Sequence, residues 1–99
     1  MIESFGNKAA KNIWEFDTSK DFPAHLHVRA KALLTIMYST KTLADLKLKG
    51  SPPNIKLHAL KGNRKGEWSI SLENGSPWRM TFRFDKGDFS NIKIEDYHD

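Results

Sequence analysis

The spacing of the apolar residues changes midway along this 99-residue chain, and that change restricts the fold more than any other feature. Up to residue 48 they recur every three or four positions, as on one face of a helix. After the segment Gly50-Ser51-Pro52-Pro53-Asn54, which cannot continue a helix, they recur at every second position, as in half-buried strands. This order predicts a single small α+β domain, residues 1–99, in which helices cover one face of a mainly antiparallel sheet.

The first half contains signals for one strand and for helices. Met1–Phe5 predicts a first strand. Helical spacing predicts core-packing helices over Lys8–Phe16, with Asn7 as the N-cap, and over Ala24–Ser39. Thr42–Leu48 is expected to add a helical turn. The core stripe of the second helix is predicted to comprise Leu26, Ala30, Leu33, Leu34 and Met37, with Ala30 and Ala32 allowing close approach.

The second half is typical of an antiparallel meander. Apolar and polar residues alternate over 55–60, 67–72, 78–84 and 89–97, with turns at Asn74-Gly75 and at 85–88. The alternation predicts that Ala59 faces the helices and that Leu60 faces away from them.

The uncovered face of this sheet is predicted to carry His58, Arg79 and Arg83, with Lys56 nearby. Few carboxylates are expected there to pair with these cations. Neighbouring positive charge disfavours protonation of an imidazole, so we expect His58 to be neutral and able to accept a proton.

Charge is distributed unevenly along the chain. The net charge is +4, but residues 29–65 hold nine basic residues against Asp45 alone, which amounts to +8. We expect this block to cover one side of the domain and to favour a phosphate backbone as partner. The alternative is that this basic block is only a solvated, lysine-rich helix and loop without a partner.

Several classes of protein are excluded by composition. The chain has no cysteine, which rules out disulfide frameworks, cysteine-ligated metals and thiol nucleophiles, and which fits a reducing cytoplasm. Charged residues interrupt the first twenty positions, and no apolar stretch approaches the length needed to span a membrane. We therefore expect a cytoplasmic protein without a membrane partner.

The polar residues suit cleavage of RNA without a metal. That reaction needs a base for the 2′-hydroxyl proton, an acid for the leaving 5′-oxygen, and cations beside the phosphorane. Candidates for proton transfer are His58, Asp96, Tyr97 and His98, and candidates for positive charge are Lys61 and Arg79. The four histidines include no pair spaced i, i+4, so we expect neither a metal nor another cofactor.

Three segments of the chain follow one another in an order typical of a known family. They are Leu57-His58-Ala59-Leu60-Lys61-Gly62-Asn63-Arg64-Lys65-Gly66-Glu67-Trp68-Ser69-Ile70, then Trp78-Arg79-Met80-Thr81-Phe82-Arg83-Phe84, and finally Asp96-Tyr97-His98. In this order the chain resembles the HigB killer toxins of the RelE/ParE superfamily of type II toxin-antitoxin systems. Pro77 departs from the family pattern, because it lengthens the hairpin and is expected to displace the start of the next strand.

The resemblance implies a RelE-like fold and a ribosome-dependent mRNA endonuclease. Such a toxin cuts the codon in the A site of the 30S subunit, without a metal, and halts translation. Its implied partner is a HigA-like helix-turn-helix antitoxin, through which alone it would meet operator DNA.

Matching the family motifs residue by residue implies a catalytic set of His58, Lys61, Arg79, Asp96, Tyr97 and His98. The assignment of acid and base among them stays open. Charge alone, with no matching motif, suggests that RNA contacts come from Lys56, Arg64, Lys65 and Arg83.

Two alternatives belong to other functional classes. One is a non-catalytic gyrase inhibitor of the ParE type, against which the histidines argue. The other is a non-toxic nucleic-acid-binding domain, in which the histidines would be dispensable.

Overall fold

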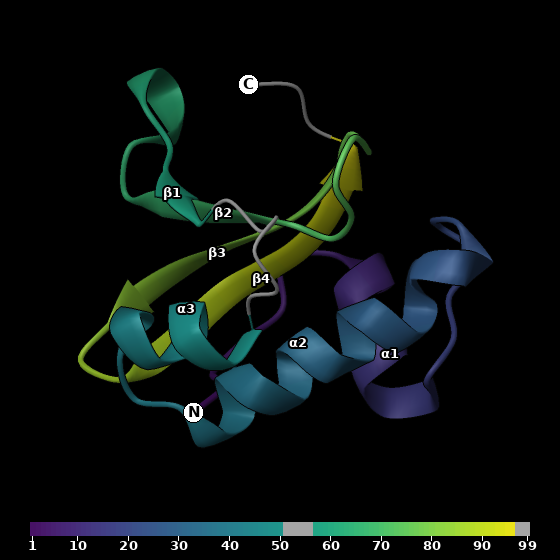
Figure 1. Cartoon of the computed structure of the whole chain (residues 1–99), viewed down its shortest axis with the longest axis horizontal. Helices are drawn as coiled ribbons and strands as arrows, with labels where there is room; N and C mark the ends of the chain where they lie inside the picture. Colours follow the sequence, from purple (N-terminus) through teal and green to yellow (C-terminus); the bar gives the residue numbers. More distant parts are fainter. Residues whose placement is uncertain (51–56, 97–99) are drawn as a thin grey trace.

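The structure is a computed structural model that describes residues 1–50 and 57–96. Its elements within these stretches are α1 (Lys8–Phe16), the 3-10 turn η1 (Ala24–Leu26), α2 (His27–Ser39), α3 (Leu43–Gly50), β1 (His58–Ala59), the 3-10 turn η2 (Gly62–Arg64), β2 (Glu67–Ser71), β3 (Trp78–Asp85) and β4 (Asp88–Asp96). The helices lie on one side of the sheet and η2 lies beyond its other side (Figure 1). The predicted α+β class is confirmed.

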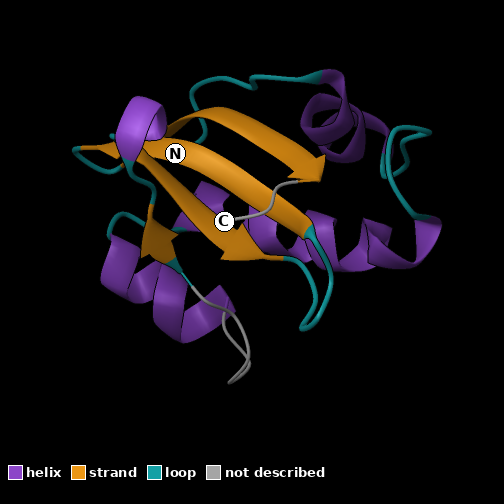
Figure 2. Ribbon diagram, turned by 90° about the horizontal axis from the view of Figure 1, so that it is seen from above, coloured by secondary structure: helices purple, strands orange, loops and turns teal. Residues whose placement is uncertain are grey.

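The sheet is an antiparallel meander. In the described part of the chain its strands pair in chain order, β1-β2-β3-β4, and Figure 2 shows them in front of the helices. The N-terminal segment lies along the edge of β4, with parallel bridges between Ile2 and Phe89 and between Phe5 and Ile92. Met1–Phe5 therefore joins the sheet through isolated bridges, where a continuous strand was predicted.

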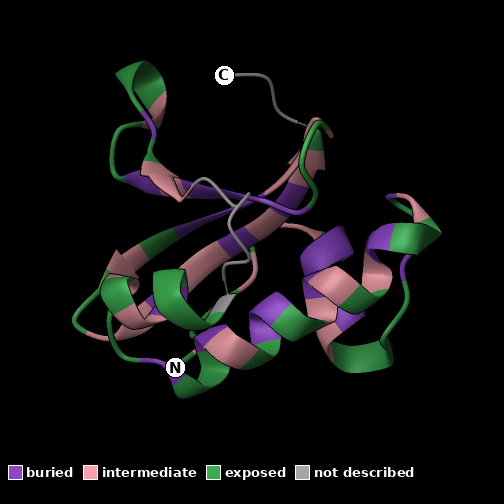
Figure 3. Ribbon diagram, in the orientation of Figure 1, coloured by how far each residue is buried: buried purple, intermediate pink, exposed green. Residues whose placement is uncertain are grey.

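One hydrophobic core lies between the helices and the sheet. All five residues of the predicted stripe on the second helix are buried, and they pack with apolar residues of β2, β3 and β4 such as Ile70, Met80 and Ile94. Figure 3 shows buried positions on α2 and along the strands. The change in apolar spacing thus correctly predicted which face of the helices packs against which face of the sheet.

Ala32 does not have the predicted role in close packing. It is exposed, and it lies with Val28 and Ile36 in a shallow pocket on the outer face of α2. Of the two alanines, Ala30 is the fully buried one. The helix is apolar on both sides, so composition alone could not distinguish its inner face.

The strand containing His58 is shorter than predicted. β1 has two residues, and Ala59, the register partner of Trp68, projects toward the helix side as predicted but is exposed at this edge of the sheet. Leu60 is buried without belonging to the core cluster. The strand ends because the chain turns after Ala59, while the Leu60 N–H still donates a hydrogen bond to the Glu67 carbonyl. β3 begins directly after Pro77, at Trp78.

A bulge interrupts the pairing of β3 with β4. Thr81 pairs with Lys93, whereas Arg83 pairs with Ser90, so β4 contains one extra residue. Asn91 has a positive φ of 52°, which accommodates it.

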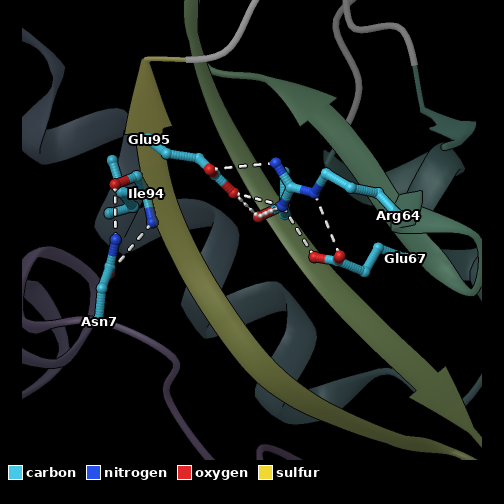
Figure 4. Close-up of polar contacts among 6 residues, drawn as sticks. Asn7, Arg64, Glu67, Ile94 and Glu95 are labelled. Carbon is cyan, nitrogen blue, oxygen red and sulfur yellow. Dashed lines mark hydrogen bonds and ion pairs between the residues drawn. The ribbon is translucent and has the colours of Figure 1, made fainter. Parts of the chain in front are cut away.

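Asn7 joins the start of α1 to the end of β4 (Figure 4). Its Oδ1 accepts hydrogen bonds from the N–H groups of Ala10, at 3.1 Å, and of Ile94, at 3.3 Å. Its Nδ2 donates to the Ile94 carbonyl at 2.9 Å. The predicted N-cap is confirmed, and the same side chain also holds β4 at Ile94.

Candidate active site

The strand register brings the candidate residues to the face of the sheet opposite the helices. His58 pairs with Ser69, and Ser69 pairs with Thr81, so these three side chains project from the same face. Arg79 and Arg83 lie two positions on either side of Thr81 in β3 and share that face. The predicted grouping of His58, Arg79 and Arg83 is therefore confirmed. We call this surface the polar face.

Two carboxylates also lie on the polar face, where few were expected. Glu67 is the register partner of Arg83, and Glu95 is the register partner of Arg79. The side chain of Glu67 is 8% exposed and that of Glu95 is 25% exposed. The expectation of a face with little negative charge was wrong, because neither Glu67 at the start of β2 nor the contribution of β4 was counted.

Arg64 reaches from η2 across the strands and binds both carboxylates (Figure 4). Its Nε and Nη2 donate to the two carboxylate oxygens of Glu67, at 3.1 and 2.8 Å. Its Nη1 and Nη2 donate to those of Glu95, at 3.1 and 2.7 Å. Nη2 also lies 3.4 Å from the hydroxyl of Thr81, which donates a short hydrogen bond to Glu95. Arg64 thus links η2, β2, β3 and β4.

This network changes the acidity of its members. The hydrogen bonds from Arg64 are the main cause that lowers the pKa of Glu67. Burial acts to raise the pKa of Glu95, but hydrogen bonds from Arg64 and Thr81 outweigh it, so this pKa is also lowered. The same bonds raise the pKa of Arg64. All three groups are consequently charged at neutral pH.

The turn around η2 presents two lysines at the rim of the polar face. Lys61 precedes η2 and Lys65 follows it, and both are exposed. Gly66, with a φ of +99°, lies so close to Arg83 that an added Cβ would be 2.8 Å from its Nη1. Lys61, Lys65 and the exposed Arg83 are therefore open to an anionic partner.

Arg79 is held by the hairpin before β3. Its Nη1 donates to the carbonyl oxygens of Ser76 and Trp78, the latter at 3.3 Å. These bonds orient its guanidinium at the end of the polar face where Glu95 lies.

Asp96 is separated from the other predicted site residues by the pleat. Asp96 pairs with Trp78, whereas Glu95 pairs with Arg79. Asp96 therefore lies on the face of the sheet that carries Trp78, opposite the polar face. Lys56, Tyr97 and His98 lie outside the described residues. Sequence reasoning missed Glu95, although its position beside Asp96 in an alternating strand was a signal for it.

The basic block does not gather on one side of the domain. Lys31 lies on α2, among the helices, where its Nζ donates to the Trp14 carbonyl at 2.7 Å and lies 2.8 Å from Asp17. The block is therefore divided between the helical side and η2. The prediction of a single basic surface was wrong because it ignored which face of the sheet each segment covers.

The other two described histidines belong to η1 and α2. His25 lies 3.0 Å from Glu73, and His27 bonds the Phe22 carbonyl. Among residues 1–50 and 57–96, no three histidine, aspartate or glutamate side chains are placed to hold a metal ion. In the same stretches, no helix is both long enough and apolar enough to cross a membrane.

The fold and the polar face define a small α+β domain whose meander carries histidine, arginine and glutamate on the side away from the helices. A family model described as "RelE-like toxin of type II toxin-antitoxin system HigB" matches residues 3–98. The chain is also 35% identical over 98 residues to a protein of Proteus vulgaris named "Endoribonuclease HigB", covering 99% of this chain and 100% of that protein. The chain belongs to the HigB family of RelE-like toxins of type II toxin-antitoxin systems.

Proposed function

We propose that this protein is an endoribonuclease toxin that cuts mRNA in the A site of the 30S ribosomal subunit and so stops translation in the cytoplasm. Membership of a toxin family and similarity to a protein named as an endoribonuclease support the nuclease activity. The observation that carries the proposal is the register that places His58, Arg79 and Arg83 on one face. Proton transfer and stabilisation of a phosphorane need such groups together.

The roles follow from chemistry and position. His58 transfers a proton, and Arg79, held by the Ser76 carbonyl, stabilises the charge that develops on the phosphate. Lys61 adds charge from the rim of the polar face, and Tyr97 and His98 complete the proposed catalytic set. Asp96 belongs to this set by the family motif alone, because the register places it on the opposite face of the sheet. Lys56, Lys65 and Arg83 are proposed to contact the RNA backbone, and no step requires a metal.

The toxin of a type II system has an antitoxin partner that neutralises it. For this chain we propose a HigA-like helix-turn-helix antitoxin, through which alone the toxin meets operator DNA. Expression of the neighbouring gene together with the toxin should restore growth if it encodes this antitoxin.

The direct test uses purified protein and ribosomes programmed with a defined mRNA. We expect new 5′ ends within the A-site codon, and we expect His58→Ala to cut roughly 10²- to 10⁴-fold more slowly. The matched control is His25→Ala, which removes a histidine that is exposed and paired with Glu73, outside the polar face.

Three results would contradict the proposal. One is growth arrest without cleavage inside codons, and another is full activity of His58→Ala. The third is inhibition of DNA supercoiling by the purified protein without cleavage of RNA, which would indicate a gyrase inhibitor.

A further inference from the structure

Arg64 lies over the middle of the polar face. Its partner Glu67 comes from β2, Thr81 from β3 and Glu95 from β4, so the guanidinium spans three strands. Thr81 is two register steps from His58, through Ser69, and Glu95 is the register partner of Arg79. Arg64 therefore bonds the register partner of Arg79 and a residue in the same cross-strand row as His58.

The charges around Arg64 do not suit a phosphate ligand. One guanidinium faces two carboxylates, so the cluster carries a net charge of about −1 when all three groups are ionised. An incoming phosphate would have to displace bidentate bonds to both carboxylates, each of which is charge-assisted. The Arg64 side chain is only 19% exposed, whereas Lys61 and Lys65 on either side of η2 are open to solvent. The lysines are better placed to meet RNA.

The hydrogen bonds of Arg64 indicate that it holds separate strands in a fixed arrangement. η2 lies beyond the short β1, which is an edge strand of the sheet, and β4 lies across β2 and β3 from it. The ion pair between Arg64 and Glu95 joins these two parts directly, over 31 residues of sequence. Two planar groups in a bidentate arrangement fix an angle as well as a distance, which a single point charge does not.

We propose that Arg64 is a positioning residue, whose guanidinium clamps the end of β4 at Glu95 against β2 at Glu67 and so holds Arg79 and His58 in register. This assignment rests on the proposed function, because the reaction that the clamp serves is RNA cleavage. It replaces the RNA contact expected for Arg64 from its charge.

The test is single-turnover cleavage on programmed ribosomes with the variants Arg64→Lys and Glu95→Gln. Lysine keeps the positive charge of Arg64 but lacks the planar guanidinium that makes bidentate bonds. Glutamine keeps the size of Glu95 but removes its negative charge and so weakens the bonds with Arg64. We expect each change to lower the maximal cleavage rate by roughly tenfold to a hundredfold, because a misplacement of about 1 Å can cost 10²-fold. The half-saturating toxin concentration should stay within about twofold of the wild-type value, since both variants keep every cation that is proposed to meet RNA. The double variant should be no slower than the slower single variant, because both changes break the same link.

Lys65→Gln is the matched control, because it alters an exposed cation in the same turn. It is expected to raise the half-saturating concentration and to reduce the salt dependence of binding, as the loss of one phosphate contact does. Circular dichroism at the assay temperature checks that each variant is folded. If Arg64→Lys does not fold, the milder Glu95→Gln decides by the same criteria.

The proposal is overturned if Arg64→Lys cuts at the wild-type rate, or if its defect appears in the half-saturating concentration. It is also overturned if the effects of Arg64→Lys and Glu95→Gln multiply in the double variant. A wild-type protein that does not cut RNA would instead overturn the proposed function, and with it the site that Arg64 is inferred to position.

Discussion

Replacement of Asn7 should reveal how strongly the end of β4 is held. Asn7→Ala removes the N-cap of α1, which typically costs about 1 kcal/mol. It also leaves the N–H and the carbonyl of the buried Ile94 without the bonds from Asn7, at about 1 kcal/mol for each. The expected loss is about 3 kcal/mol of unfolding free energy, a large share of the ~5–15 kcal/mol typical of a small domain.

Asn7→Ser separates the two contributions. The serine hydroxyl can still cap α1, but its shorter side chain does not reach Ile94, so we expect a loss of about 2 kcal/mol. The assay is urea unfolding followed by far-ultraviolet circular dichroism, with slopes compared to show that the variants expose similar surface. Asn63→Ala, at an exposed position in η2, is the control and should change the unfolding free energy by less than about 0.5 kcal/mol.

The reasoning about Asn7 fails in either of two cases. If Asn7→Ser is as stable as the wild type, the bonds to Ile94 contribute nothing. If Asn7→Ser is as unstable as Asn7→Ala, the cap contributes nothing, and the geometry at Ala10 has been misjudged.

Other parts of the structure give further predictions. The lowered pKa values of Glu67 and Glu95 supply stability that is complete above their unfolded pKa and is lost as the pH falls through the folded values. Urea midpoints should therefore drop as the pH falls below about 5, and Glu95→Gln should make this drop smaller. If the midpoint of Glu95→Gln falls with pH as steeply as that of the wild type, the prediction is refuted. Gly66→Ala should cost about 1–2 kcal/mol in unfolding free energy, since its φ is positive and a Cβ would meet Arg83, and a neutral result would contradict this. Met80→Ala, at a fully buried position, should cost about 2–5 kcal/mol in the same urea assay, and a smaller effect would show that the core closes around the cavity.

Local patterns predicted the elements that depend on neighbours in sequence. The helix Lys8–Phe16 has the predicted bounds because Asn7 caps its start and the apolar spacing defines one face. The strand that begins at Trp78 follows its alternation for eight residues, because it is paired on both sides. In both cases the local signal and the packing agree.

The errors occur where distant parts of the chain decide the outcome. The bulge at Asn91 lets Phe89 and Ile92, three positions apart, both enter the core, and a strict period of two does not predict this. The clamp that we propose for Arg64 depends on the register of β2, β3 and β4 together, which its basic character alone does not reveal.

The candidate site was predicted in part. His58, Arg79 and Arg83 were placed on one face by alternation, which is a local property. Glu95, the acidic partner of Arg64, was not predicted, because the neighbouring Asp96 belongs to the family motif and was assigned to the site in its place. One step along a strand reverses the direction of a side chain, so adjacent residues can serve opposite faces of a sheet.

The bridges of the N-terminal segment to β4 have a consequence for synthesis. The Gly6 N–H donates to the Ile92 carbonyl at 2.7 Å, so a segment that is translated before all the helices pairs with a strand that is translated after the rest of the sheet. A nascent chain that has not released β4 lacks this partner, much of the core and Glu95, and it cannot complete the sheet. The toxin thereby gains its complete sheet only after β4 has emerged from the ribosome that translates it.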